Sequence, residues 1–361
     1  MSKVDILKTL FSKKLLDWSA TQHRPMPWKG EKNPYLIWLS EIILQQTRVE
    51  QGLPYFQNFA KSYPTVKDLA DAPEDDIMKL WQGLGYYSRA RNLHATAKHI
   101  AYELNGEFPK MYKDILLLKG VGPYTAAAIA SFAYGLPHAV VDGNVYRVLS
   151  RIFGIETPID STEGKKAFFK LANELIDIKQ AGKYNQAIMD FGATLCTPKL
   201  SKCTVCPFNT NCQALKNKTI HKLPVKSKKL VRKERHFHYL ILNYKSCLWV
   251  KKRTEKDIWQ NLYDFPLIEF PERKEQEEVK NHSTWQEILT NKDFSITKIS
   301  KPYRQMLTHR KIIATFWDIK LNESLEENDF MKIEKDNLKQ YAFPKVIIQY
   351  LQDKSLYLEL F

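Results

Sequence analysis

The chain has 361 residues, 44% hydrophobic and 26% charged, so it is long enough for two domains with real cores and is neither disordered nor fibrous. Lys and Arg outnumber Asp and Glu by 55 to 40, a net charge of +15 that favours a polyanionic partner, although a generically basic proteome would also produce it. No apolar run approaches the roughly 20 residues of a membrane span, and the N-terminus lacks a secretory signal. We therefore expect a soluble, cytoplasmic protein with no membrane contact.

The first part of the chain is expected to be all-α. Apolar residues recur at helical steps over 6–15 and again over 90–100. Asn33 and Pro34 provide an N-cap and a first-turn proline for a helix that should run to Gln46.

Glu41 lies inside this apolar helix. Burial disfavours the charged form of a carboxyl group, so the pKa of Glu41 should be raised, as suits a general acid near neutral pH. A glutamate that reaches solvent from a partly exposed helix is the alternative.

Two glycine-containing segments follow. The stretch 83–91 sets glycines beside tyrosines and arginines, a composition that suits a wedge in a DNA duplex but is also typical of a packed turn. Leu118–Thr125 joins two helical patterns, and amides at its second helix could bind a DNA phosphate; an ordinary helical hairpin is the alternative. The predicted phosphate-binding residues are Gly120, Val121, Gly122 and Thr125.

Asp142 follows the apolar run 139–141 and should lie at a helix N-terminus, where it is expected to stay ionised. It could equally be a plain N-cap. A protonated Glu41 and an ionised Asp142 together would suit cleavage of a glycosidic bond through an oxocarbenium-like state.

Four of the five cysteines fall within seventeen residues, with the spacing C-x6-C-x2-C-x5-C at Cys196, Cys203, Cys206 and Cys212. Four thiolates at this density indicate a metal site. Structural zinc and a 4Fe-4S cluster both fit the ligand count, and the single C-x2-C pair moderately favours iron–sulfur.

The second part of the chain is built differently, since none of the thirteen glycines follows Gly192. Residues 216–235 carry nine Lys and Arg against one Glu, which predicts a basic linker that lies against phosphates or is merely solvated. We expect a helical domain over 1–215, this linker, and an α+β domain over 236–361. The expected elements of the last domain are strands in 236–251 and 312–319, a helix over 283–289 with a Ser283–Gln286 capping box, and a helix over 345–351.

Taken together, these motifs resemble the MutY-type adenine DNA glycosylases of the helix-hairpin-helix superfamily. The likeness rests on the four cysteines and five collinear segments: 23–28, 40–49, 84–93, 120–125 and 141–145. It implies an all-α glycosylase domain followed by an α+β Nudix-like domain. It also implies a 4Fe-4S cluster on the cysteines and removal of adenine mispaired with 8-oxoguanine or guanine in duplex DNA.

By motif position, Glu41 resembles the acid that protonates adenine N7, and Asp142 resembles the carboxylate that stabilises the sugar cation. Asn144 and Tyr124 match polar residues that orient the carboxylate and water. The resemblance implies further substrate-binding residues: Arg24, Trp28, Lys29 and Asp190 at the adenine pocket, and Gln46, Thr47, Leu84 and Tyr86 around the mismatch.

The second domain resembles the Nudix-like domain that recognises 8-oxoguanine in this family, chiefly over 253–266. It has no glycine with which to open or close a Nudix box, so we expect no nucleotide hydrolysis. Thr308 and His309 align with the loop that contacts the oxidised base. Leu307 replaces an aromatic residue there, which predicts softer discrimination for 8-oxoguanine.

The enzymatic alternative is an endonuclease III-like glycosylase and lyase acting on oxidised pyrimidines. That activity needs a lysine nucleophile where this chain has Tyr124, so we expect a monofunctional enzyme that leaves an abasic site. Lys119 lies nearby and leaves weak lyase activity open. A non-catalytic DNA-damage-binding protein is the rival of another class. A monomer with contacts to an abasic-site endonuclease and a sliding clamp, in a bacterial nucleoid, is typical of the family.

Overall fold

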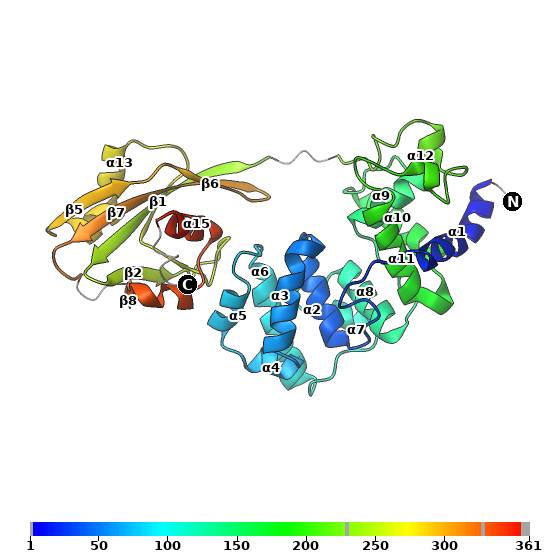
Figure 1. Ribbon diagram of the computed structural model, residues 1–361, viewed down its shortest axis with the longest axis horizontal. Coiled ribbons are helices and arrows are strands. Elements are labelled where there is room, and N and C mark those ends of the chain that lie inside the picture. The colour runs from blue at the N-terminus through cyan, green and yellow to red at the C-terminus, as the bar shows by residue number, and fades with distance from the viewer. Residues whose placement is uncertain (1–2, 228–230, 326–328, 355–361) are drawn as a thin grey trace. The chain divides into compact units, whose positions relative to one another are not determined.

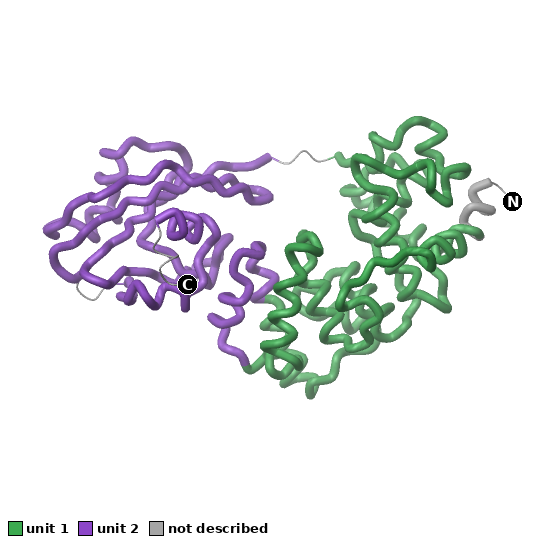
Figure 2. Tube along the Cα trace, viewed as in Figure 1, with its two compact units in different colours: residues 1–71, 92–229 green, residues 72–91, 230–361 purple. Residues whose placement is uncertain are grey.

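The computed structural model describes residues 3–227, 231–325 and 329–354. It divides into two compact units (Figure 2). Unit 1 comprises Met1–Asp71 and Asn92–Lys229, and unit 2 comprises Ala72–Arg91 and Leu230–Phe361. No helix in the described ranges is long and apolar enough to cross a membrane.

The secondary structure of unit 1 is helical, with no strand among its described residues, as predicted. Its elements are α1 (Lys3–Ala20), α2 (Pro34–Leu44), α3 (Val49–Ser62), α4 (Val66–Asp71), the second part of α6 (Ser88–Lys98), a π-helical turn η1 (His99–Glu103), α7 (Tyr112–Leu116), α8 (Pro123–Tyr134), α9 (Gly143–Phe153), α10 (Thr162–Leu175), η2 (Ile178–Gln180), α11 (Ala181–Thr194), η3 (Cys203–Val205) and α12 (Gln213–Lys216). The core lies where α11 packs against α1, α8 and α9 (Figure 1).

The helix that carries Glu41 begins as its sequence predicts. The side chain of Asn33 accepts a hydrogen bond from the amide of Tyr35, and Pro34 opens α2. The helix ends at Leu44 rather than at Gln46, because Gln46 has a left-handed backbone with φ of 56°. Packing against α8 and α3 encloses α2.

Much of the predicted linker packs on unit 1. Leu223 is buried in the core of the unit, and Ile220 and Val225 pack against it. The amide and hydroxyl of Ser227 donate to Asp160. Residues 228–230 lie outside the described part of the chain. The segment up to Ser227 is therefore attached to the helical unit and is not a solvated tether.

Unit 2 is the predicted α+β domain, joined by residues 72–91. Its elements are α5 (Glu74–Leu80), the first turn of α6, β1 (Lys233–Tyr244), β2 (Cys247–Lys252), β3 (Tyr263–Asp264), β4 (Leu267–Phe270), α13 (Gln276–Lys280), α14 (Ser283–Leu289), β5 (Phe294–Ile299), β6 (Tyr303–Met306), β7 (Arg310–Leu321), β8 (Met331–Glu334), η4 (Lys335–Gln340) and α15 (Lys345–Asp353).

The sheet of unit 2 is mixed. Its main path runs β3-β2-β1-β7-β5; β4 pairs with β1, β6 with β7, and β8 with β2. The long strands β1 and β7 are parallel neighbours, and the other pairs are antiparallel. Trp285 of α14 packs edge-on against Trp317, whereas Tyr350 of α15 stacks on Phe316, the preceding residue of β7. Because successive side chains of a strand point to opposite faces, the two helices cover opposite faces of the sheet.

Of the local predictions for this unit, the structure divides one and contradicts another. The segment 236–251 forms a hairpin of two strands, since Lys245 adopts a left-handed φ of 53° between β1 and β2. The helix over 283–289 is present, but its N-cap is His282, whose ring nitrogen accepts from the amide of Thr284, so the Ser283–Gln286 capping box is wrong.

Candidate active site

A cavity of about 560 Å³ opens in unit 1 beside the predicted catalytic acid. It is lined by residues from α1, the loop before α2, α2 itself, α8, η2 and the start of α11: Leu16, Ser19, Ala20, Trp28, Lys29, Gly30, Glu31, Lys32, Ile37, Ser40, Glu41, Phe132, Gln180, Gly182, Lys183 and Gln186. Its mixed lining, with an indole ring, amides and one buried carboxyl group, is of the kind that binds a flat polar molecule.

Glu41 is only 7% exposed. Burial raises its pKa to about 7, against the opposing effect of a hydrogen bond from Tyr124 and with the support of the nearby charge of Asp142. The raised pKa predicted from the apolar helix is confirmed. Near neutral pH this side chain can hold and deliver a proton.

Asp142 is the N-cap of α9. Its Oδ1 accepts from the amide of Val145 at 2.8 Å, and its Oδ2 accepts from Nδ2 of Asn144 at 2.8 Å. Burial nevertheless raises the pKa of Asp142, outweighing these hydrogen bonds and the charge of Arg147. The helix N-terminus favours the carboxylate, as expected, but desolvation acts in the other direction.

Tyr124 stands in the first turn of α8, close enough to Glu41 for each side chain to change the pKa of the other. Its pKa is raised by burial and by the charges of Glu41 and Asp142. Its hydroxyl also donates to Sδ of Met189 on α11, at 3.2 Å. The structure thus brings three of the four predicted catalytic residues into one interacting group, and Asn144 joins it through Asp142.

Arg147 holds the side chain of Asn144 in place. Its Nη2 donates to Oδ1 of Asn144 at 2.8 Å and to the carbonyl oxygen of Gly192 at 2.7 Å, and its Nε donates to the carbonyl oxygen of Cys196 at 2.7 Å. A Cβ at position 192 would lie 2.6 Å from Cβ of Asn144, so α11 can approach this site only with glycine there. One buried arginine therefore connects the N-terminal turn of α9 with the start of the cysteine segment.

The residues predicted at the adenine pocket divide into two groups. Trp28 and Lys29 line the cavity. Asp190 does not; it is buried and pairs with Arg24 at 2.5 Å and with Lys29 at 3.1 Å. Gln186, one turn earlier on α11, lines the cavity and donates to Asp190 at 3.1 Å. The sequence motifs gave no signal for Gln186.

Gln46 and Thr47 follow α2 and are not among the residues that line this cavity. Gln46 is exposed in its left-handed conformation, and the Thr47 hydroxyl donates to the carbonyl oxygen of Gln45 at 3.3 Å.

The predicted phosphate-binding hairpin joins α7 and α8. Gly120 has a φ of 80°, and a Cβ there would meet Cβ of Asn92 at 2.8 Å, so glycine is required. Gly122 is the N-cap of α8, whose first-turn amides lack helical acceptors. The hydroxyl of Thr125 is buried and accepts from Gln45, so only its backbone amide is available for a phosphate. The amide of Val121 is used within the turn.

The four clustered cysteines wall a single small cavity together with Arg151, Phe191 and other residues of unit 1. Burial raises the pKa of Cys206 to about 11, and the charges of the other three thiols contribute to the rise. Arg151 lies within 3.5 Å of Sγ of Cys196. Among the described residues, no three His, Cys, Asp or Glu side chains gather closely enough to hold one metal ion.

The other residues predicted around the mismatch and at the oxidised base, which are Leu84, Tyr86, Thr308 and His309, belong to unit 2. Tyr86 is exposed and left-handed, and its hydroxyl hydrogen-bonds the hydroxyl of Thr308 in the turn between β6 and β7. His309 is exposed in the same turn, whereas Leu84 is buried. The structure thus joins Tyr86 and Thr308, which are 222 residues apart in the chain.

Comparison with known proteins identifies both parts of the chain. Residues 39–174 match the HhH-GPD superfamily of base excision DNA repair proteins, and residues 238–353 match the NUDIX domain. The adenine DNA glycosylase of Buchnera aphidicola subsp. Schizaphis graminum is 40% identical over 71% of this chain and 74% of its own length. The enzyme of that name from Schizosaccharomyces pombe is 30% identical over 91% of this chain and 83% of its own length.

The chain belongs to the adenine DNA glycosylase family.

Solved structures agree with the helical fold of this family. A thermostable thymine-DNA glycosylase superimposes with a TM-score of 0.56 at 29% identity, covering 60% of this chain and all of its own. Endonuclease III bound to DNA superimposes over 60% of this chain and 98% of its own with a TM-score of 0.52, at 21% identity, which supports the fold alone.

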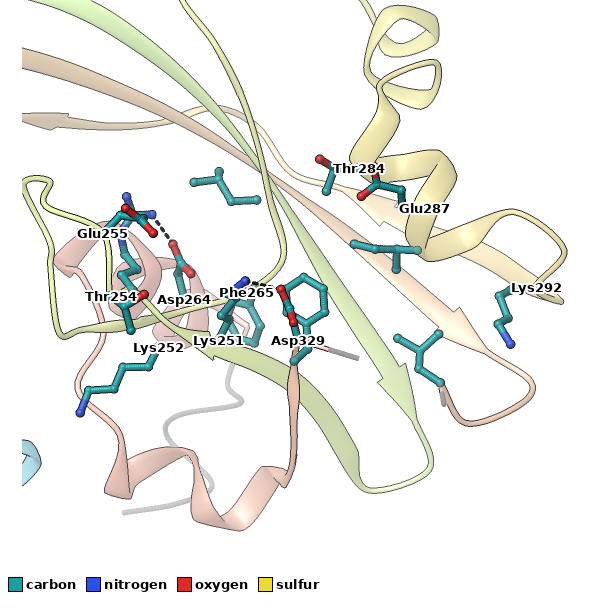
Figure 3. A pocket seen from close by; sticks show the side chains of 15 residues that line it. Lys251, Lys252, Thr254, Glu255, Asp264, Phe265, Thr284, Glu287, Lys292 and Asp329 are labelled. Atoms are coloured by element: carbon teal, nitrogen blue, oxygen red, sulfur yellow. Dashed lines mark hydrogen bonds and ion pairs between the residues drawn. The ribbon is translucent and has the colours of Figure 1, made fainter. Parts of the chain in front are cut away.

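Unit 2 of this glycosylase-family chain has a cavity of its own, of about 680 Å³ (Figure 3). None of the predicted mismatch-reading residues lines it. Two of its carboxylates are paired with cations, Asp264 with Arg253 at 2.6 Å and Asp329 with Lys251 at 3.0 Å, as the dashed lines in Figure 3 mark. The expectation that the domain hydrolyses no nucleotide remains a prediction.

Proposed function

We propose that this protein removes adenine opposite 8-oxoguanine or guanine in duplex DNA, hydrolyses the N-glycosidic bond and leaves an abasic site in an unbroken strand. The observation that carries the proposal is the interacting group of Glu41, Tyr124 and Asp142 beside a cavity of about 560 Å³. Family membership supports adenine as the excised base.

Chemistry begins with proton transfer from Glu41 to a ring nitrogen of adenine, which makes the base a better leaving group. A pKa of about 7 leaves close to half of the Glu41 side chains protonated at neutral pH. As the bond to the base breaks, positive charge develops on the sugar. Asp142, whose charged form is supported by Val145, Asn144 and Arg147, stabilises that charge.

Tyr124 supports a monofunctional reaction, since a phenol cannot form the Schiff base through which a lysine cleaves the strand. Lys119 is exposed at the end of the hairpin, and its carbonyl oxygen, which accepts from Thr96 at 2.8 Å, fixes the backbone there. We therefore propose that Lys119 takes no part in strand scission.

Extrusion of adenine from the helix costs a few kcal/mol of unstacking. We propose that amides at the Gly122 end of α8 hold a phosphate of the adenine strand, and that Gln46 and Tyr86 fill space left in the duplex. In unit 2, Thr308 and His309 contact the oxidised base. The hydroxyl of Thr308 already has a partner in Tyr86, which supports a shared role for these two residues.

The four cysteines are proposed to hold a 4Fe-4S cluster, in which each iron takes one thiolate. Four thiols wall one cavity, and burial together with the charges of the other three raises the pKa of Cys206, which fits a positively charged inorganic core that takes thiolate ligands. When bound, the cluster supplies a rigid crosslink of the loop from Cys196 to Cys212. Arg151 would then lie against one cluster ligand, Cys196.

The test is single-turnover cleavage of labelled duplexes containing A opposite 8-oxoguanine, A opposite G, A opposite T, T opposite G, and thymine glycol, each with and without alkali. Breakage of the adenine strand only after alkali, fastest opposite 8-oxoguanine and absent opposite T, is the expected result. Breakage at thymine glycol without alkali would assign the protein to the endonuclease III activity and make Lys119 the first residue to mutate.

A further inference from the structure

Two cations face each other at the start of the long parallel strands of unit 2. The register of β1 and β7 places Lys233 directly opposite Arg310, and the next pair along is Glu234 opposite Lys311. Glu234 and Lys311 have opposite charges and form an ion pair at 2.5 Å. Among the described residues, no carboxylate is close enough to Lys233 or Arg310 for an ion pair. Because like charges directly opposite each other destabilise a sheet, the first pair carries an uncompensated cost.

The two cations wall a hollow of about 440 Å³. The carboxylates of Glu234 and Glu269 also line it, but both are engaged, Glu234 with Lys311 and Glu269 with Arg235 at 2.6 Å. None of the described residues that line the hollow is aromatic, so it offers no ring on which a nucleobase could stack. A charge-dense anion such as a phosphate group fits a hollow with two unpaired cations and no stacking surface.

Backbone hydrogen bonds attach this hollow to the turn between β6 and β7. The amide of Lys233 donates to the carbonyl oxygen of His309 at 3.2 Å, and Nε of Arg232 donates to the carbonyl oxygen of Leu307 at 3.2 Å. Arg310 directly follows His309 in the chain. The position of the hollow relative to this turn is therefore fixed within unit 2.

We propose that Lys233 and Arg310 together bind one backbone phosphate of the DNA strand whose oxidised base contacts Thr308 and His309. The inference rests on the proposed contact of that turn with 8-oxoguanine. Each nucleotide of the strand carries one phosphate, so a base held at the turn brings phosphates close to the hollow. Neither the sequence motifs nor the comparisons assign a role to these two cations.

The chemistry of the pair predicts what it contributes. The guanidinium of Arg310 can donate two hydrogen bonds to one phosphate, and the ammonium of Lys233 adds a point charge. The bound phosphate also offsets the repulsion between the two cations. Phosphate contacts position a duplex but do not read its sequence. The pair should therefore strengthen the binding of duplexes with 8-oxoguanine and with guanine equally, whereas the hydroxyl of Thr308 distinguishes the two bases.

The experiment measures, by fluorescence anisotropy, the dissociation constants of the full chain for duplexes containing A opposite 8-oxoguanine and A opposite guanine. The adenosine carries a 2′-fluorine, which keeps the glycosidic bond intact because it destabilises the sugar cation. Lys233→Gln and Arg310→Gln should each weaken binding about three- to tenfold, by the same factor on both duplexes. From about 50 to 300 mM KCl, the double variant should reduce the slope of log Kd against log salt by about 1, as expected for one phosphate.

Lys298→Gln is the matched control, because Lys298 is an exposed lysine on β5, at the end of the main strand path of the same unit. It should change both dissociation constants by less than about twofold. Urea denaturation gives a second readout. Removal of one of two repelling cations should leave the free energy of unfolding unchanged or raise it. A lower stability of Lys233→Gln and Arg310→Gln would assign the pair a structural role and refute the proposal.

Neutral methylphosphonate linkages, introduced one at a time into the 8-oxoguanine strand, locate the bound phosphate. One linkage within about two nucleotides of the lesion should weaken the binding of the wild-type chain but not that of the double variant. Sensitivity at this linkage without any adenine excision by the wild-type chain would refute the proposed function and keep the phosphate site. Excision with no linkage whose effect depends on the pair would do the reverse.

Three results of the binding experiment would overturn the proposal. They are unchanged affinity in both single variants, a loss no larger than that of Lys298→Gln, and a loss confined to the 8-oxoguanine duplex. Weaker binding of inorganic phosphate by the variants, with duplex affinity retained, would also overturn it, because the hollow would then hold a free anion rather than DNA.

Discussion

The predicted catalytic residue Glu41 of unit 1 and the predicted recognition residue Tyr86 of unit 2 differ in their exposure to solvent. Glu41 is 7% exposed, whereas Tyr86 is 42% exposed. The first is buried, and desolvation is the main cause that raises its pKa to about 7. The second is proposed to meet DNA that arrives from solution, and this role requires an accessible side chain. A proposed catalytic acid is thus buried before DNA binds, whereas a proposed recognition residue is exposed until then. In this chain the two residues lie in separate units.

The largest expected effect is on the chemical step alone. Glu41→Gln keeps the shape of the side chain but cannot deliver a proton, so single-turnover excision should fall by about 10²- to 10⁴-fold. The dissociation constant for mismatched DNA, measured by fluorescence anisotropy, should change by less than about threefold. Glu50→Gln, at an exposed glutamate of α3, is the matched control. Parallel loss of binding and excision would show that Glu41 serves recognition as well.

The second prediction concerns Arg151, a buried arginine of unit 1 that donates hydrogen bonds to backbone carbonyl groups around the cysteine segment. Arg151 is 3% exposed and donates to the carbonyl oxygens of Thr197, Pro198, Ile220 and Leu223. Arg151→Leu removes all of these buried hydrogen bonds, so the free energy of unfolding in urea should fall by about 3 kcal/mol or more, and the iron content should fall with it. Arg48→Leu, at an exposed arginine, should change neither. Full iron content in Arg151→Leu would uncouple the arginine from the cysteine loop.

Burial of Glu41 has a pH-dependent cost that the exposed groups of unit 2 lack. Its pKa is raised from 4.5 to about 7 on folding, so the folded chain binds this proton more tightly and the free energy of unfolding falls as pH rises through that window. At pH 8 the cost is up to about 3 kcal/mol. Glu41→Gln should therefore be more stable than wild type at pH 8 but not at pH 4.5, in urea titrations at each pH. A stability difference independent of pH would contradict the burial argument.

The smallest effect is expected at Thr308, in the turn between β6 and β7. Thr308→Ala removes a hydroxyl worth about 1 kcal/mol, so the preference for 8-oxoguanine over guanine should fall about fivefold. The excision rate opposite guanine should be unchanged in single-turnover assays. Thr290→Ala, at an exposed threonine outside the turn, is the control. An equal loss of rate on both duplexes would place Thr308 in general DNA binding.

Local signals made much of this structure predictable. The Asn33 cap, the glycines of the hairpin and the strand composition of β7 are each decided by a few neighbouring residues, and each was found from the sequence. The spacing of the cysteines likewise places them together around one cavity.

Tertiary packing decided the rest. Gln186 and Met189 reach the site only because α11 crosses α8 and α9, more than forty residues after Asp142, and no local pattern reports that crossing. The pKa of Asp142 is raised by burial, which the helix N-terminus does not reveal. The capping of α14 by His282 was missed because histidine is an uncommon N-cap.

Unit 2 is assembled from two stretches of chain, and this affects how a shortened gene product would behave. Within it, Asp75 binds Lys252 at 2.6 Å and Tyr263 at 3.1 Å, and Glu74 binds Asn261 at 2.7 Å. A premature stop codon after the cysteine loop would delete the later stretch but keep α5, whose acidic residues would lose all three of these partners. Truncation of the gene therefore does more than remove one domain. A loss of mismatch preference in such a product would have two causes, the absence of Thr308 and His309 and the loss of the contacts that hold α5.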